Sequence, residues 1–390
     1  MSDSRGRVAV AGVGHSRVYR RADVPLGILA VEACKQAIED AGLKARDIDG
    51  IVTANYQPFE MGEPDRDGIN LVTPGFVVQA MGLEVNWGES VSAGSTGQCL
   101  IEAINAVAAG TCAYALVFRA LYSPAGRRYG SISPSTAEGP GAFRGPYGLF
   151  APGMFALYMQ RYMDKYGASR EQMAAFAVNN RLNALKWEHG YWRQHGAGPL
   201  TMEDYMTSRM ISSPLCIHDC DLPVQGCGAF VVTTAQRAKD LRHPPAYVLA
   251  TSAPVNPHPG IVYSLEEFTE AGARLGRGLL TRAGIGPKDV DVANLYDGFS
   301  VLTPLWAEAL GFCGEGEGFS FITSPSLPLN TSSGNLGAGR MHGVPQIMDS
   351  VLQVMGRSGP RQVENAHIAL AVVLALDAGK GIVFSKTPNG

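Results

Sequence analysis

Residues 41–51 read Ala-Gly-Leu-Lys-Ala-Arg-Asp-Ile-Asp-Gly-Ile, and residues 283–293 read Ala-Gly-Ile-Gly-Pro-Lys-Asp-Val-Asp-Val-Ala. The two stretches align without a gap at a spacing of 242 positions. Each has a glycine at which a helix would stop, a basic residue, an Asp-(Ile/Val)-Asp step and then an apolar run typical of a strand. Solenoid repeats are only about 20–50 residues long. The spacing instead predicts two copies of one α/β unit in a single molecule, with a site where they meet.

The composition is that of a large globular chain. Its 390 residues exceed the roughly 250–300 at which single cores stop growing, so we expect two halves, at residues 1–245 and 246–390. Apolar residues make up 46% and charged residues 17%, and the net charge of -3 argues against a nucleic-acid partner. The sequence shows no signal peptide, no run of about 18 apolar residues and no disulfide framework among seven cysteines. These features favour a cytoplasmic protein with reduced thiols.

Apolar runs alternate with helical patterns along most of the chain. In the first half the order is typical of βαβ units with a parallel sheet. Strands are predicted at residues 8–12, 50–54, 113–118 and 229–234, and helices at 26–41 and 99–109. A strand predicted at residues 246–250 opens the second half. Residues of about 120–215 break this order with Gly/Pro-rich loops and polar helices, and we predict an inserted lobe there. The second half is predicted to repeat the unit, with a helix at 265–283, a strand at 292–295, helices through residues 309 and 355, and strands at 368–376 and 381–385.

Three glycine-rich places terminate or follow predicted strands. Glycine allows backbone to approach a ligand closely, and the N-terminus of a helix offers free N–H groups to a developing anion. The three places are Gly94–Gly97, the run Tyr296-Asp297-Gly298-Phe299-Ser300, and the run from Gly337 to Gly343. They are the candidate site.

These motifs, in this order, resemble the thiolase superfamily. The resemblance covers residues 8–385 and is strongest to the sterol-carrier/lipid-transfer thiolases. It rests on the Ala-Gly-Leu segment, the Tyr-Asp-Gly-Phe-Ser run and the Gly-Ala-Gly-Arg-Met-His-Gly loop. It implies a thiolase fold, in which two pseudo-duplicated halves form a layered αβαβα core with an inserted loop domain.

The chain departs from the thiolase pattern at each position of thiolytic chemistry. Where the resemblance places the nucleophilic cysteine, sixteen residues before the helix-ending Gly110, this chain has Gly94. The His-Asp-Cys-Phe or Asn-Glu-Ala-Phe block reads Tyr296-Asp297-Gly298-Phe299, and the Gly-His-Pro loop reads Gly339-Arg340-Met341. Without that cysteine the chain cannot hold a covalent acyl-enzyme there. Cys99 is a possible substitute, although a packed core thiol is the simpler interpretation.

One branch of the family has lost the cysteine and carries tyrosine in the His-Asp-Cys-Phe position, namely the side-chain aldolases of steroid degradation. The resemblance to this branch implies retro-aldol cleavage of a steroid or branched β-hydroxyacyl-CoA to a ketone or aldehyde and a short acyl-CoA. A phenol with its ordinary pKa of about 10 is a weak base at neutral pH, so a nearby cation would be needed. The candidate catalytic residues are Tyr296, Asp297, Arg340 and His342, and the candidate backbone donors for an enolate oxygen are Gly94, Ser95 and Gly339. For Asp297 the sequence favours a structural turn carboxylate over an acid or base, whereas Arg340 and His342 fit catalysis and loop anchoring equally well.

The remaining predictions concern partners and alternatives. Arg127 and Arg128 are candidates for binding the phosphates of coenzyme A (CoA). The resemblance implies a homodimer and a separate accessory protein made of a zinc ribbon and an OB-fold. The acyl-CoA is expected as the substrate, and no cofactor is expected. No metal is expected either, because the Cys-x-His-x-Cys spacing at residues 216–220 is unlike that of a zinc knuckle. Two alternatives stay open: an acyltransferase or Claisen-type enzyme with an unusual nucleophile, and a non-catalytic acyl-CoA- or lipid-binding scaffold.

Overall fold

A computed structural model of the protein describes residues 5–55, 65–92, 95–123, 147, 149, 151–255 and 264–390. Within these residues nine strands form one sheet in the order β3-β2-β4-β7-β1-β8-β11-β10-β9. The first copy supplies β1 (Val8–His15), β2 (Gly50–Asn55), β3 (Trp87–Ser92), β4 (Tyr114–Leu121) and β7 (Gly226–Thr234). The second copy supplies β8 (Ala246–Ser252), β9 (Val292–Asn294), β10 (Ile368–Val373) and β11 (Lys380–Ser385).

The predicted duplication is confirmed by the turns that follow the first helix of each copy. Helix α1 (Leu26–Asp40) is followed by Gly42 at φ 76°, and helix α9 (Leu265–Ala283) by Gly284 at φ 66°. Both glycines occupy the left-handed region, where a side chain is disfavoured. A 3₁₀ turn then leads into β2 in one copy (Ala45–Asp47) and into β9 in the other (Pro287–Asp289).

Two equivalent aspartates hold the start of the neighbouring parallel strand in each copy. The carboxylate of Asp49 accepts hydrogen bonds from the N–H groups of Ala113 and Tyr114, where β4 begins. The carboxylate of Asp291 accepts from His367 and Ile368, where β10 begins. Since the two aspartates are also 242 positions apart, the similarity of sequence reflects the same hydrogen-bonded unit built twice.

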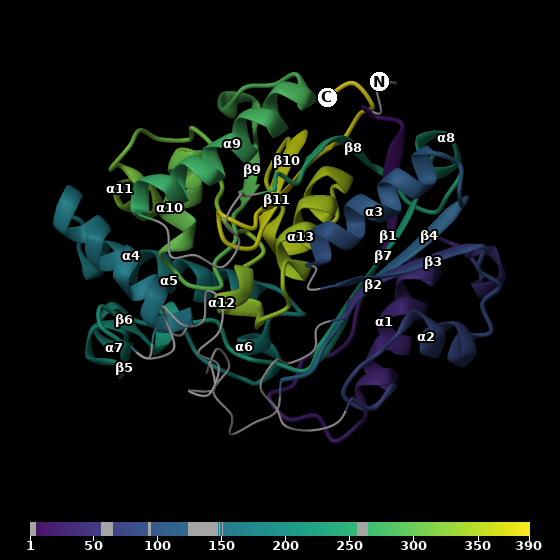
Figure 1. Ribbon diagram of the computed structural model, residues 1–390, viewed down its shortest axis with the longest axis horizontal. Helices are drawn as coiled ribbons and strands as arrows, with labels where there is room; N and C mark the ends of the chain where they lie inside the picture. The colour runs from purple at the N-terminus through teal and green to yellow at the C-terminus, as the bar shows by residue number, and fades with distance from the viewer. Residues whose placement is uncertain are drawn as a thin grey trace.

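The two copies meet around a central layer of helices. Helix α3 (Thr96–Ala108) packs against β2, β4 and β7 of the first copy and against β10 and β11 of the second. Helix α13 (Val344–Met355) packs against β8 to β11, and all of its residues are buried. With α1 on the outer face of the first copy and α9 on that of the second, the layers follow the predicted αβαβα order (Figure 1).

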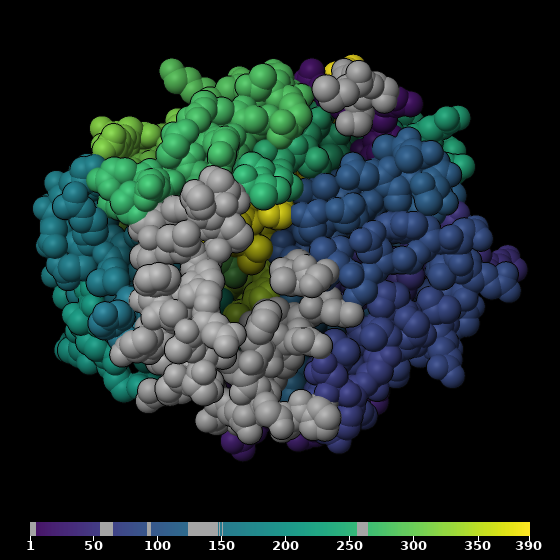
Figure 2. All heavy atoms as spheres, viewed as in Figure 1, coloured from purple at the N-terminus to yellow at the C-terminus, as the bar shows by residue number. Residues whose placement is uncertain are grey.

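The lobe and the connecting helices complete the described structure. Between β4 and β7 the lobe contains α4 (Ala151–Tyr166), α5 (Arg170–Lys186), α6 (Tyr191–Gln194), α7 (Met202–Thr207) and the hairpin of β5 (Met210–Ser212) and β6 (Leu215–Cys216). Figure 2 shows the lobe in teal beside the green helices of the second copy. The other helices are α2 (Pro74–Met81), α8 (Ala235–Ala238), α10 (Leu302–Ala309), α11 (Gly318–Thr323) and α12 (Gly334–Ala338). Nothing in the structure tests the domain boundary at residues 245 and 246, which stays a prediction.

Three sequence-based expectations need correction. The sheet is mixed, not parallel: β2 is parallel to β3 and β4, and β9 to β10, while the other pairs are antiparallel. A strand buried on both faces has the same apolar composition in either direction, so its direction could not be predicted. The helix expected from residue 99 begins at Thr96, because Ser95 caps it. The glycine-rich run at residues 337–343, expected as a loop, begins within a short helix, α12.

Candidate active site

The Tyr296 segment follows directly from β9 at the edge of the sheet. Tyr296 is 7% exposed and its ring lies over Gly298, where a Cβ atom would lie 2.7 Å from the ring carbon Cε1 and 3.0 Å from the hydroxyl. Glycine is therefore required at position 298 by the tyrosine itself. Asp219 holds the segment at Ser300. The backbone carbonyl of Asp219 accepts a hydrogen bond from the N–H of Ser300 at 2.9 Å, and the Asp219 carboxylate accepts one from the Ser300 hydroxyl at 2.6 Å.

The Asp297 carboxylate caps α12. It accepts hydrogen bonds from the backbone N–H groups of Asn335 (2.6 Å) and Leu336 (3.3 Å) and from the side-chain amides of Asn180 (2.9 Å) and Gln346 (3.0 Å). Complete burial nevertheless raises the pKa of Asp297 to about 8, against the effect of the backbone donors, and the charge of Asp221 adds to the increase. Asp297 thus joins the Tyr296 segment to the glycine-rich loop, and its catalytic role stays a prediction.

The loop after α12 carries Arg340 and His342. Gly339 has φ 98° and its N–H donates to the carbonyl of Asn335 at 3.0 Å, so a role as oxyanion donor would require that bond to break. The backbone N–H of Arg340 donates to the carbonyl of Leu222 at 2.8 Å, and its Nε lies 4.0 Å from the carboxylate of Asp221. His342 has φ 48° and a buried side chain.

The N-terminus of α3 meets this loop. The Ser95 hydroxyl accepts a hydrogen bond from the N–H of Gln98 at 3.3 Å, and the N–H of Thr96 donates to the carbonyl of His342 at 3.3 Å. Residues of the two copies, Ser95 from one and His342 from the other, are thereby brought together, as the duplication predicted. Gly94, Arg127 and Arg128 lie outside the described residues.

A buried arginine that the sequence reading missed lies behind His342. Arg119, on β4, is completely buried, and its Nη2 lies 3.2 Å from Nδ1 of His342. Its other terminal nitrogen donates to the carbonyl of Ala54. The signal was present in the sequence, because an arginine in the apolar run Ala-Leu-Val-Phe-Arg-Ala-Leu of a buried strand needs polar partners.

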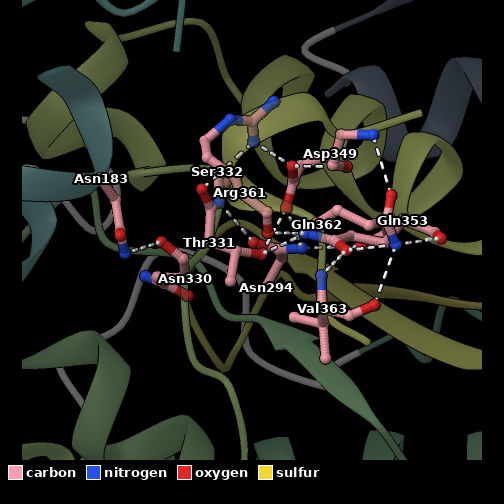
Figure 3. Close-up of polar contacts among 12 residues, drawn as sticks. Asn183, Asn294, Asn330, Thr331, Ser332, Asp349, Gln353, Arg361, Gln362 and Val363 are labelled. Atoms are coloured by element: carbon pink, nitrogen blue, oxygen red, sulfur yellow. Dashed lines mark hydrogen bonds and ion pairs between the residues drawn. The ribbon is translucent and has the colours of Figure 1, made fainter. Parts of the chain in front are cut away.

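A second missed feature is the polar network that supports both loops (Figure 3). Asp349 of α13 accepts hydrogen bonds from Asn294 at 3.2 Å and from Thr331 at 2.5 Å, and it pairs with Arg361. Asn330 pairs with the backbone of Leu295 through both atoms of its amide, at 2.6 and 3.0 Å. The residues just before Tyr296 and those just before α12 are therefore held to one another.

The thiols show how this site differs from that of a thiolase. All seven cysteines lie in the described part of the chain, none is in a disulfide, and five are buried. Burial raises the pKa of each thiol above its usual range. For Cys99, at the start of α3, the pKa rises to about 12. A nucleophilic cysteine needs a lowered pKa, so none of these thiols has the environment of a nucleophile.

The described residues show neither a metal-binding cluster nor a membrane-spanning helix. They contain no group of three His, Cys, Asp or Glu side chains arranged to hold a metal ion. None of their helices is both long and apolar enough to cross a membrane. A polar cleft of about 390 Å³, lined by His15, Asp40, His189 and Arg357 among others, includes none of the predicted site residues.

Comparisons with known proteins agree with the fold. A family model described as thiolase C-terminal domain-like matches residues 258–383. The chain is 32% identical over 374 residues to the 17-hydroxy-3-oxo-4-pregnene-20-carboxyl-CoA lyase of Mycobacterium tuberculosis, covering 90% of this chain and 92% of that protein. It is also 32% identical to the steroid side-chain-cleaving aldolase of Thermomonospora curvata, covering 92% and 93%.

A solved structure gives the same result in three dimensions. The Ltp2-ChsH2(DUF35) aldolase matches with a TM-score of 0.85 and 30% identity, covering 98% of this chain and 99% of that chain. Both the sequence similarity and the structural match extend over nearly the whole molecule. The chain therefore belongs to the thiolase superfamily and, within it, to the group of steroid side-chain-cleaving aldolases.

Proposed function

We propose that the protein is an aldolase that cleaves a carbon–carbon bond in a steroid or branched β-hydroxyacyl-CoA. The β-hydroxyl loses its proton, the bond between the α and β carbons breaks, and its electron pair forms the thioester enolate. A proton then returns to the α carbon. The products are a ketone or aldehyde and a shorter acyl-CoA, with no acyl-enzyme. The names of the two relatives, a CoA lyase and an aldolase, support this reaction.

One observation carries the proposal: the chain has no activated thiol. Gly94 occupies the position of the thiolase nucleophile, and burial keeps all seven thiols protonated at neutral pH. An acyltransferase needs a nucleophile to carry the acyl group, whereas retro-aldol cleavage needs only proton transfer and stabilisation of the enolate. The second reaction is therefore the better match to these residues.

The roles that we propose follow from the two loops. Tyr296 is the base that takes the β-hydroxyl proton, and Arg340 supplies positive charge near it. Asp297 holds the loops in register, and His342 with the backbone after Gly94 faces the enolate oxygen. Arg127 and Arg128 are proposed to bind the phosphates of CoA.

The proposed assembly includes the acyl-CoA, a second copy of the chain and an accessory protein. Strand β3 is the outermost strand of the first copy, and in the described structure it pairs only with β2. An open strand edge is suited to pairing with another copy, which supports a homodimer. The name of the matched solved structure includes a second component, ChsH2(DUF35), which supports an accessory protein. That this protein consists of a zinc ribbon and an OB-fold is proposed from the family resemblance alone. We propose a cytoplasmic enzyme that needs no further cofactor.

The proposal is tested with 17-hydroxy-3-oxo-4-pregnene-20-carboxyl-CoA, the compound in the relative's name. The purified protein, alone and with candidate accessory proteins, is expected to release a steroid 17-ketone and propionyl-CoA without added CoA. Intact-protein mass spectrometry during turnover is expected to show no acylated chain. Cleavage that depends on free CoA, or an acyl adduct on the protein, would contradict the aldolase and support the acyltransferase.

A further inference from the structure

His342 and Arg119 form a buried pair beside the N-terminus of α3. The Arg119 Nη2 lies 3.2 Å from the His342 Nδ1, and both side chains are at least nine-tenths buried. The guanidinium is also held by the carbonyl of Ala54. Arg119 thus approaches the imidazole from β4, while the backbone of His342 is held by the N–H of Thr96 on α3.

The contact fixes the proton of the imidazole. A guanidinium has only donors and keeps its charge inside a protein. The hydrogen bond can therefore form only if Nδ1 of His342 accepts, which leaves the ring proton on Nε2. A doubly protonated ring would present a second donor to Arg119 and could not make this bond. The pair selects one of the two neutral tautomers.

The surroundings of the ring act in the same direction. Burial lowers the pKa of His342 well below its usual value, and the charges of Arg340 and Arg119 lower it further. The thiols of Cys99 on α3 and Cys227 on β7, which lie close enough to Arg119 to feel its charge, stay protonated because burial raises the pKa of each. Since α3 also begins here with the positive end of its dipole, the site around the ring favours a negative charge on a ligand.

We infer that Arg119 is a positioning residue that holds His342 as a neutral Nε2–H donor, and that this N–H stabilises the thioester oxygen as the enolate forms. This inference rests on the proposed retro-aldol function. In the reaction written above, the β-hydroxyl proton passes to the base and another proton returns to the α carbon. His342 keeps its own proton throughout. It therefore acts by hydrogen bonding and exchanges no proton with the substrate.

The tautomer can be measured without any change to the protein. In protein labelled with ¹⁵N at its eight histidines, the His342 signals are identified by their loss in His342→Gln. We expect Nε2 to carry the proton and Nδ1 to carry none, with no titration from about pH 5.5 to about pH 8.5. A proton on Nδ1, or titration within this range, would overturn the inference. Arg119→Met is expected to give a mixture of the two neutral tautomers of His342. The measurement on the wild-type protein does not depend on whether this variant folds.

Kinetics separate a donor from a base. Glutamine at position 342 keeps an N–H near the place of Nε2 but cannot act as a base, whereas leucine can do neither. Loss of one such donor lowers kcat by about 10²–10³-fold, and we expect a loss of this size in His342→Leu. Turnover by His342→Gln is expected to be at least about tenfold faster than turnover by His342→Leu. Equal loss in both variants would exclude the donor role. Failure of the wild-type protein to cleave the steroid CoA ester would instead overturn the proposed function, while the NMR result would still report the tautomer.

Discussion

The guanidinium of Arg361 and the carboxylate of Asp349 form an ion pair in which both side chains are buried. The same carboxylate accepts hydrogen bonds from Asn294, two residues before Tyr296, and from Thr331, three residues before α12. One ion pair therefore fixes the two loops of the site relative to each other.

Removing one partner of this pair should strongly destabilise the protein. Arg361→Met leaves the Asp349 charge buried without its cation, which costs about 3–5 kcal/mol in other proteins. The free energy of unfolding from urea denaturation is the measurement. The matched control is Arg277→Met, which breaks an exposed pair with Glu270 and should cost only about 0–1 kcal/mol. Equal effects of the two changes would show that Arg361 is not needed to balance the buried charge.

Replacing the proposed base should abolish turnover while leaving the fold intact. Tyr296→Phe removes only the hydroxyl, and loss of a general acid or base typically costs about 10²–10⁴ in rate. Turnover of the steroid CoA ester is measured together with the melting temperature. Tyr166→Phe, which removes a lobe hydroxyl bonded to Glu315, serves as the control and should stay active. Full activity of Tyr296→Phe would favour a scaffold in which another component carries out the chemistry.

The ionisation of Asp297 should make stability fall with increasing pH. Its pKa is about 8 in the folded protein, against 3.8 as the usual value, so between these two values the folded state binds the proton that the unfolded state has released. The free energy of unfolding contributed by this group then decreases by up to about 1.4 kcal/mol per pH unit. Below the lower value the full contribution is present, and above about pH 8 it is lost.

Asp297→Asn removes that titration and isolates it from all other groups. The difference in unfolding free energy between wild type and variant is expected to shift in favour of the variant as the pH rises from about 5 to about 8. Urea denaturation at several pH values measures it. A difference that does not change with pH would mean that Asp297 is ionised throughout, held by its four donors.

The space beside Asp297 should tolerate no side chain at position 334. Gly334 has φ 56°, and a Cβ atom there would lie 2.0 Å from the Asp297 carboxylate. Gly334→Ala is therefore expected to lower both stability and turnover. Gly356 has a similar φ of 72° but open space around it, so Gly356→Ala should show only the backbone cost of about 1–2 kcal/mol. Similar losses in the two variants would show that backbone strain alone, without the carboxylate, accounts for the effect.

The repeating unit could be predicted from the sequence because its signals are local. A glycine after a helix and an apolar run each act within a few residues, as do Asp47 and Asp289, whose carboxylates accept hydrogen bonds from the N–H groups of Lys44 and Gly286 three positions earlier. Helix α9 was predicted with the bounds that the structure has. Helix α12 could not be predicted in the same way, because its cap is Asp297, 38 residues from Asn335 in the chain. The same limit applies to Arg119, whose partner His342 is 223 residues away.

The candidate site shows the same difference between local features, which could be predicted, and contacts between distant elements, which could not. The sequence singled out the Tyr296 segment and the loop around His342 as candidate parts of one site, and in the structure Asp297 joins the two through its hydrogen bonds with the N–H groups of Asn335 and Leu336. It could not show that the N–H of Gly339 is already bonded to Asn335, or that Asp349 and Arg361 hold the loops together. These facts depend on packing between distant elements.

The hydrogen bond from the N–H of Thr96 to the carbonyl of His342 joins the beginnings of two helices, α3 and α13, that hold corresponding places in the two copies. The candidate site thus includes residues of both copies, so neither half expressed by itself would contain all of it. The two helix beginnings nevertheless carry different groups: Ser95 caps α3, whereas the residue before Gly343 at the start of α13 is His342, whose imidazole is bonded to Arg119.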